Sequence, residues 1–273
     1  MLPYLRVFWR IFFDFRGYRP QSVTPLSVGR WLSQFSPPYR SQLYLLLDHV
    51  VYYSEKATIQ TLVSLNRRIL DRLNSDCIGL DRTVYVAVDT AGSSSHVMLN
   101  LLRDAENLER KGASLVDSRD AYRLEELTSD IASGAIIYVD DFSGTGKQFR
   151  RARDWAAQFI VGAFSEFFLV PVICEEAHQR IAESGVVPVT SLTHTIQQRP
   201  LHRESEILSD DCKRNIVDLC AQINPNAGLG FNNLATMVVF YRNAPNTMPL
   251  VFRGSLGQSP YRGVFPRSDD LPF

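Results

Sequence analysis

Cysteine is scarce in this sequence of 273 residues, and its four cysteines show no metal-binding spacing. Cys77, Cys174, Cys212 and Cys220 form no C-x-x-C pair, and no histidine stands at a zinc-finger offset from any of them. The pattern therefore indicates no structural metal. We expect four reduced thiols in a cytoplasmic protein, since disulfide frameworks belong to oxidising compartments.

The sequence also has no excess of charge of either sign. Its 29 Lys and Arg residues balance 29 Asp and Glu residues, so no overall basic field indicates a nucleic-acid binder. Long apolar runs are missing too. Arg6, Arg10, Asp14 and Arg16 interrupt the aromatic stretch 1–20, which excludes a membrane span and disfavours a signal peptide.

The aromatic N-terminal stretch itself has three interpretations. It packs on its own domain, it docks a partner protein, or it lies on a membrane surface. The remaining sequence is that of a globular protein, because 45% hydrophobic residues over this length can bury a large core.

Hydrophobic periodicity predicts an α/β fold with a mostly parallel sheet flanked by helices. From residue 83 onward, short apolar runs alternate with helical patterns, whereas the charged residues 106–129 suggest a loop or hairpin with short helical pieces. We expect residues 1–75 to form an N-terminal arm and helical cap, and residues 76–200 to form the core. Residues 201–273 would add a C-terminal helix, strand and irregular tail packed on that core.

Two predicted strand-to-helix turns carry most of the polar chemistry: residues 89–96 (DTAGSSSH) and residues 140–147 (DDFSGTGK). Such turns at the carboxyl ends of parallel strands direct backbone N–H groups toward anions. The second turn is no nucleoside-triphosphate P-loop, since Asp141 replaces the required first glycine and Gln148 the required Ser or Thr. A dinucleotide-binding G-x-G-x-x-G is also absent there.

What remains is a hydrophobic strand, the acidic pair Asp140 and Asp141, three residues, and a Thr-Gly turn. This order resembles the signature of the type I phosphoribosyltransferases. The resemblance implies that both aspartates are catalytic carboxylates that orient the ribose of 5-phosphoribosyl diphosphate. It also implies a loop that holds the 5-phosphate and consists of Ser143, Gly144, Thr145, Gly146 and Lys147.

By the same resemblance, the earlier turn is the pyrophosphate loop, formed by Asp89, Ala91, Gly92, Ser93 and Ser94. Arg110 and Lys111 occupy the position of the family's lid, although a solvated charge run is an alternative interpretation. Mg²⁺ is implied as a cofactor that binds together with the diphosphate, and no residue is assigned as its ligand. Gln148 stands where many catalytic members have Thr, and no base-recognising sequence is evident, so binding without catalysis stays open.

Residues 31–35 (WLSQF) and 228–252 are similar to a prokaryotic branch of phosphoribosyltransferase-like proteins found in conflict systems. This resemblance implies an effector of a retron-type antiphage defence system. Its implied partners are a retron reverse transcriptase with multicopy single-stranded DNA and its RNA, and a small helix-turn-helix protein. Two alternatives are a nucleobase-salvage phosphoribosyltransferase and a non-catalytic nucleotide-sensing or assembly module.

Overall fold

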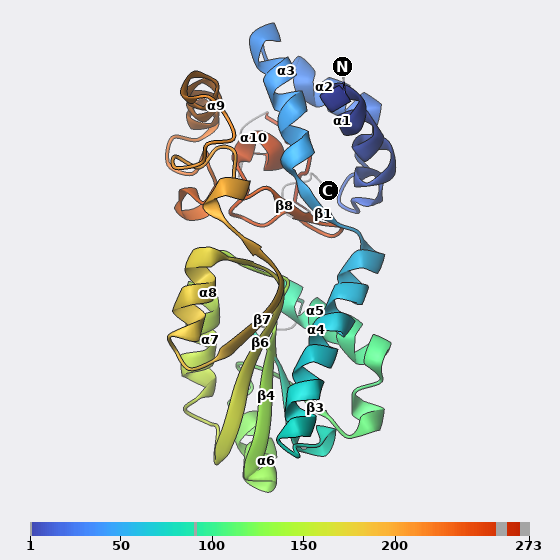
Figure 1. The fold of residues 1–273 in the computed structure, drawn as a ribbon, viewed down its shortest axis with the longest axis vertical. Helices are drawn as coiled ribbons and strands as arrows, with labels where there is room; N and C mark the ends of the chain where they lie inside the picture. Colours follow the sequence, from blue (N-terminus) through green and yellow to red (C-terminus); the bar gives the residue numbers. More distant parts are fainter. Residues whose placement is uncertain (1, 90–91, 255–260, 268–273) are drawn as a thin grey trace. The chain divides into compact units, whose positions relative to one another are not determined.

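The computed structural model of the chain, shown in Figure 1, describes residues 2–89, 92–254 and 261–267. Within these ranges, every helix is too short or too polar to cross a membrane. This finding agrees with the charged residues that interrupt the N-terminal aromatic stretch.

A six-stranded sheet forms the centre of residues 58–194. Its strands are β2 (Thr83–Ala87), β3 (Ser114–Asp117), β4 (Ser133–Val139), β5 (Phe142–Ser143), β6 (Ala163–Cys174) and β7 (Val187–His194). Neighbours follow the order β3-β2-β4-β6, β5 and β7 also pair with β6, and all of these pairings are parallel. The predicted mostly parallel sheet is confirmed.

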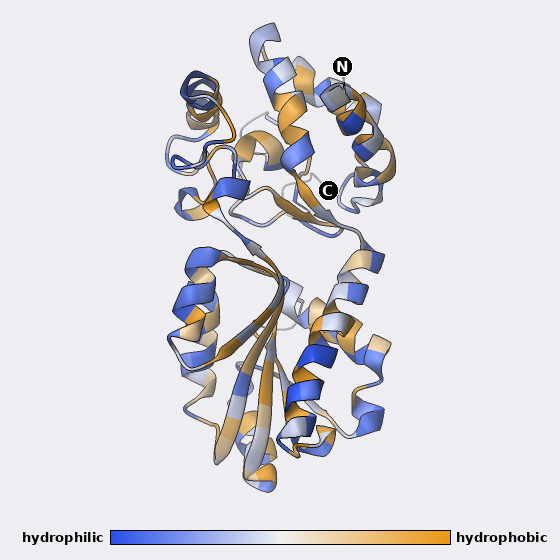
Figure 2. Ribbon diagram, in the orientation of Figure 1, coloured by the Kyte–Doolittle hydropathy of each residue, from blue (hydrophilic) through white to orange (hydrophobic). Residues whose placement is uncertain are grey.

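Helices cover both faces of this sheet, as Figure 1 shows. One face packs on α4 (Glu55–Ser75) and α5 (Ser94–Glu106), and the other packs on α6 (Ala121–Ile131), α7 (Lys147–Ala156) and α8 (Glu175–Ala182). Alternate residues of β2 join different core clusters, because successive strand side chains point to opposite faces. Since both faces are buried, the strands are almost continuously apolar, and Figure 2 shows apolar residues along much of the central strands.

The charged residues 106–129 contain helical pieces, as predicted, but they are more regular than the predicted loop or hairpin. They contain the short helix η4 (Glu109–Lys111), strand β3 and most of α6. The side chain of Asp120 accepts a hydrogen bond from a backbone N–H in the first turn of α6, which stabilises the start of the helix. Leu124 and Leu127 are buried on its inner face. Charged residues between these apolar positions obscured the helical pattern.

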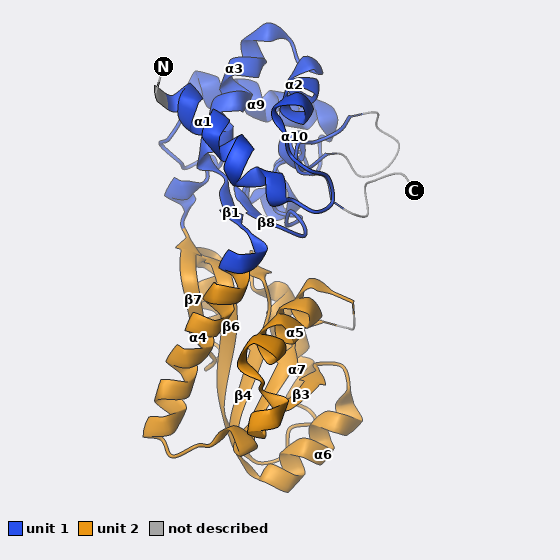
Figure 3. Ribbon diagram, turned by 90° about the vertical axis from the view of Figure 1, so that its right-hand side faces the viewer, with its two compact units in different colours: residues 1–57, 195–273 blue, residues 58–194 orange. Residues whose placement is uncertain are grey.

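The chain forms two compact units, coloured separately in Figure 3. Residues 58–194 form the sheet unit, and residues 1–57 and 195–273 form what we call the terminal unit. In the terminal unit, the strands are β1 (Val51–Tyr53) and β8 (Val238–Phe240), and the α-helices are α1 (Leu2–Phe13), α2 (Pro25–Ser33), α3 (Pro37–Leu46), α9 (Asp210–Ile223) and α10 (Leu250–Arg253). Short 3-10 helices complete the described elements: η1 (Phe15–Gly17), η2 (Leu47–His49), η3 (Leu80–Arg82), η5 (Ile196–Gln198) and η6 (Phe231–Asn233).

The boundaries of the two compact units differ from those of the three predicted segments. Helix α4 begins directly after Ser54, whose hydroxyl accepts a hydrogen bond from the backbone N–H of Ala57 at 3.2 Å. The apolar face of this helix, which includes Leu62, Leu65 and Ile69, then joins the core of the sheet unit. Residues from both ends of the chain share the core of the terminal unit, where β1 pairs in parallel with β8.

Trp31 connects distant parts of the sequence within the terminal unit. Its side chain is buried, and its indole N–H donates to the backbone carbonyl of Val251 at 2.8 Å. The indole ring packs on Phe35 and Phe252, with centroids 5.9 and 5.6 Å away. This residue of α2 therefore holds the C-terminal segment against the N-terminal helices.

We predict that Trp31→Ala lowers the free energy of unfolding by about 3–5 kcal/mol, because it removes a buried aromatic side chain and leaves a cavity. Urea denaturation followed by circular dichroism measures this change. Trp155→Ala is the matched control, since Trp155 is 45% exposed and its removal is expected to cost less than that of Trp31. Equal losses in the two variants would contradict the anchoring role of Trp31.

Candidate functional site

Asp140 and Asp141 lie at an interruption between two strands that share one register. Strand β4 ends at Val139 and β5 begins at Phe142, and both pair with β6 at the same sequence offset. The aspartates lie opposite a part of β6 that contains Pro171, which has no N–H to donate. The regular ladder therefore stops at the acidic pair and resumes after it.

Both carboxyl groups of the acidic pair have a raised pKa. Asp140 is only 6% exposed, and burial is the main cause of its raised pKa, followed by repulsion from Asp141 and a smaller contribution from Asp89. Burial also raises the pKa of Asp141, although hydrogen bonds, including one with the Ser94 side chain, oppose the increase. The backbone N–H of Asp141 donates to Oδ1 of Asp140 at 2.9 Å. The fold thus concentrates negative charge where solvation is poor.

The turn after β2 contributes the third carboxylate. The backbone N–H of Asp89 donates to Oγ of Ser95 at 2.9 Å, and the hydroxyls of Ser93 and Ser95 are also 2.9 Å apart. Gly92 has a φ of +88°, a left-handed conformation that glycine adopts without steric cost. Ala91, the remaining residue of the predicted pyrophosphate loop, lies outside the described residues.

The predicted phosphate loop joins the acidic pair to α7. Ser143 is buried in β5, Gly144 and Thr145 are half-buried, and Lys147 is exposed in the first turn of α7. Gly146 caps this helix with a φ of +71°, so a side chain here would be strained. The N–H groups in the first turn of a helix lack intrahelical partners and suit an anion. The loop is therefore a glycine-containing turn that leads directly into the N-terminus of α7.

Side chains connect the two turns and extend the site toward β3. Nε2 of Gln148 donates to Oδ2 of Asp89 at 3.2 Å, and Nη2 of Arg119 lies 3.8 Å from Oδ1 of the same carboxylate. Nearby in the fold, Nδ1 of His96 lies 3.1 Å from Oδ1 of Asp117. Arg119 was not among the predicted site residues, because the strand that precedes it was not predicted. The short apolar run within residues 114–117 was the available signal.

Arg110 and Lys111 are not brought to the acidic pair, which corrects the predicted position of the lid. Both lie in η4, before β3, and therefore near the amino end of a parallel strand. The acidic pair follows the carboxyl end of β4, at the opposite edge of the sheet. Lys111 instead pairs with Glu106, with 3.3 Å between Nζ and Oε2. By contrast, Arg119 follows the carboxyl end of β3.

Comparison with known protein families gives a match for most of the chain. The PRTase-CE family model matches residues 28–267. The chain belongs to the PRTase-CE family. The phosphoribosyltransferase-like fold expected from the acidic pair and the Thr-Gly turn is thereby confirmed. A search of the curated proteins found no match to this PRTase-CE protein.

The carboxylates of the PRTase-CE site fit a magnesium ion only when a diphosphate accompanies it. In the described part of the chain, no group of three His, Cys, Asp or Glu residues is arranged to hold a metal ion. Mg²⁺ bound to a substrate diphosphate needs only one or two protein carboxylates, because phosphate oxygens and water complete its coordination. Asp89 and the acidic pair meet that smaller requirement.

We predict that Asp140→Asn raises the melting temperature of the ligand-free protein at about pH 8 by a few degrees, corresponding to about 1 kcal/mol. Because the folded-state pKa is raised, ionisation of Asp140 destabilises the fold above that pKa. The penalty is absent below the pKa of the unfolded chain, about 3.9, so the gain should vanish near pH 4. Differential scanning fluorimetry across this pH range measures both effects.

Asp71→Asn is the control for this measurement, because Asp71 is exposed on α4. Its melting temperature should follow that of the unmodified protein at every pH. A melting temperature of Asp140→Asn that falls at about pH 8, or a gain that grows toward low pH, would show that the buried carboxylate stabilises the fold.

Proposed function

We propose that this PRTase-CE protein is a phosphoribosyltransferase-like effector of a retron-type antiphage defence system. It binds phosphoribosyl diphosphate or a related nucleotide and acts as a regulated ribosyl-transferring or nucleotide-processing toxin. The observation that carries the ligand assignment is the contact between two anion-binding turns. Ser94 hydrogen-bonds to Asp141, so the turn after β2 directly adjoins the acidic pair.

Each part of phosphoribosyl diphosphate has a chemical counterpart in the proposed site. Vicinal ribose hydroxyls are donors that suit Asp140 and Asp141, because ionised carboxylates only accept hydrogen bonds. The 5-phosphate suits the N–H groups of residues 143–147, and the diphosphate suits the N–H groups and hydroxyls of residues 92–94. Family membership and this match of donors with acceptors support the same class of ligand.

Three carboxylates beside a diphosphate require positive charge. Arg119 provides one cation at Asp89, and Mg²⁺ carried by the diphosphate would provide another. When bound, Mg²⁺ would neutralise charge on the leaving diphosphate during ribosyl transfer. The acidic pair would hold the ribose hydroxyls and stabilise the positive charge that develops at C1.

One observation favours the alternative of a non-catalytic sensing or assembly module. Gln148, which stands where many catalytic members have Thr, directs its amide to Asp89. This bond ties the two turns together. A ligand that must separate them would shift the protein between two conformations, which suits a nucleotide sensor as well as an enzyme.

The proposed partners are a retron reverse transcriptase, its multicopy single-stranded DNA with RNA, and a small helix-turn-helix protein. The terminal unit supports a regulated role, because it is a large addition to the sheet unit with a core of its own. A compact salvage enzyme has no need of such an addition. We propose that the partners restrain the effector until phage infection releases it.

We predict that the purified protein binds phosphoribosyl diphosphate with Mg²⁺ in isothermal titration calorimetry. Asp140→Asn combined with Asp141→Asn should weaken binding at least about tenfold, because charge-assisted hydrogen bonds are lost. Addition of EDTA should also weaken binding, whereas Asp71→Asn should have no effect. Unchanged affinity in the double variant would rule out the acidic pair as the ribose site.

We further predict little base-dependent release of pyrophosphate when the protein is incubated with labelled phosphoribosyl diphosphate and nucleobases. Rapid release would support the salvage alternative and contradict the effector proposal. In cells that carry the whole gene neighbourhood, the same double variant should abolish phage defence and toxicity. Defence that survives this change would assign the site to sensing or assembly.

A further inference from the structure

The outer face of α1 is strongly apolar. Six of the thirteen exposed large hydrophobic side chains in the described part of the chain lie on this one helix, with exposed fractions between 42% and 65%. They are Tyr4, Leu5, Phe8, Trp9, Phe12 and Phe13. We call this set the aromatic face. Five of its six members are aromatic, which is unusual for a surface in contact with water.

The aromatic face consists of two ordered ridges. Residues four apart on a helix are neighbours, so positions 4, 8 and 12 form one ridge and positions 5, 9 and 13 form the other. The rings of Phe8 and Phe12 are 6.4 Å apart between centroids, and those of Trp9 and Phe13 are 5.4 Å apart. Because the rings pack on one another, little side-chain entropy remains to be lost when a partner covers them.

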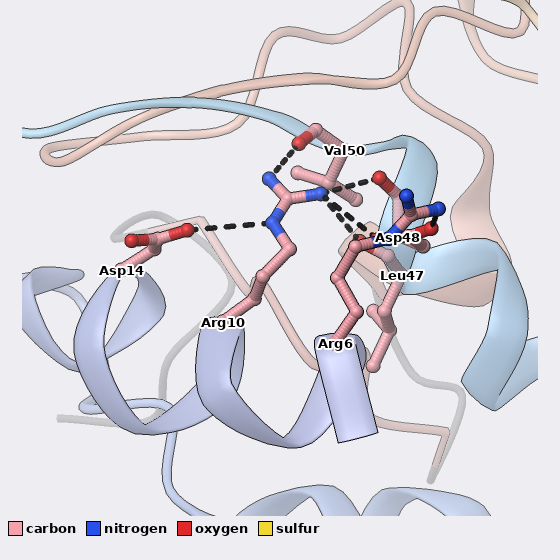
Figure 4. Close-up of polar contacts among 6 residues, drawn as sticks. All are labelled: Arg6, Arg10, Asp14, Leu47, Asp48 and Val50. Atoms are coloured by element: carbon pink, nitrogen blue, oxygen red, sulfur yellow. Dashed lines mark hydrogen bonds and ion pairs between the residues drawn. The ribbon is translucent and has the colours of Figure 1, made fainter. Parts of the chain in front are cut away.

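Buried side chains and polar contacts fix the position of α1 in the terminal unit. Figure 4 shows Arg6 directed to the carboxylate of Asp48, with 2.7 Å between Nε and Oδ1. It also shows Arg10, whose guanidinium contacts Asp14 and donates to the backbone carbonyls that precede β1, including that of Val50. Val7 and Ile11 are buried beneath the helix. These contacts prevent α1 from rolling over to bury its aromatic face.

Charge decides what class of partner fits the aromatic face. Both arginines of α1 pair with carboxylates, since Arg6, whose side chain is 68% exposed, pairs with Asp48, and the mostly buried Arg10 pairs with Asp14, so each positive charge is compensated. Helices that lie on anionic membranes carry Lys and Arg around the apolar face, and nucleic-acid surfaces need cations as well. The partner surface must therefore be apolar and uncharged.

Area then favours a second copy of the same face. The exposed fractions add up to about three whole aromatic side chains, on the order of 600 Å². A patch of this size lies at the upper end of the range for the largest apolar patch of a single copy, and such patches are often functional. Two copies together would bury on the order of 1,200 Å², which is the lower end of the range for specific interfaces.

We propose that the aromatic face of α1 is a homodimerisation surface that packs against α1 of a second copy. Ridges of residues four apart interdigitate at a crossing angle of about −50° when two such helices meet. A two-fold axis would place the same residues on both sides, as an isologous interface requires. This proposal concerns the terminal unit and does not depend on the ligand of the sheet unit.

Sedimentation velocity of the full chain, over a range of about 1–50 µM, tests the proposal at concentrations where interfaces of this size associate. We expect a dimer. Trp9→Glu should raise its dissociation constant at least about tenfold, because dimerisation would bury an unpaired carboxylate. Phe13→Lys, at the C-terminal end of the same ridge, should have the same effect.

Trp155→Glu is the matched control, because Trp155 is exposed to a similar degree on α7, outside the aromatic face. It should leave the dimer intact. A chain that is monomeric at every concentration, or a dimer that resists both substitutions in α1, would overturn the proposal. Monomers that bind phosphatidylcholine vesicles through Trp9 would also overturn it and assign the face to lipid.

Discussion

Two adjacent carboxyl groups are held at the end of a buried parallel strand, where water solvates them poorly. This placement raises the pKa of both groups, and the surrounding structure must compensate for it. Hydrogen bonds to the carboxyl groups offset part of this unfavourable free energy. The sheet, which is buried on both faces, stabilises the fold enough to tolerate the rest. Ligand hydroxyls and a cation would solvate and neutralise these carboxylates. Relief of their poor solvation would therefore contribute to the affinity for the ligand.

The sheet unit was largely predictable because its strands are continuous apolar runs, and continuous runs result when helices cover both faces. The weakest predictions concerned β3 and α6. A four-residue strand gives little periodic signal, and the charged residues on α6 separate its buried leucines. Because β3 was not predicted, the lid was assigned to the wrong residues. A residue before a parallel strand lies near the amino ends of the strands, and a residue after it lies near the carboxyl ends. Arg110 precedes β3 and Arg119 follows it.

The sequence suggests which residues form the candidate site, but it does not give the contacts among them. The order of strand, acidic pair and Thr-Gly turn is local, so the sequence contains all of it. The bond between Gln148 and Asp89 joins positions 59 residues apart, and no local pattern encodes such a pair. The division into two compact units was unpredictable for the same reason, because it depends on contacts between residues far apart in the sequence. Nothing in the periodicity of residues 51–53 indicates a partner strand at residues 238–240, yet these strands pair.

The pairing of β1 with β8 affects the order in which the two units can fold during synthesis. Protein synthesis releases the N-terminal helices first, then the whole sheet unit, and only at the end the residues that complete the terminal unit. Domains fold as units during synthesis, so the sheet unit can finish while residues 1–57 still wait for their partners. The sheet unit, which is one continuous segment, can therefore fold before the core of the terminal unit has all of its residues.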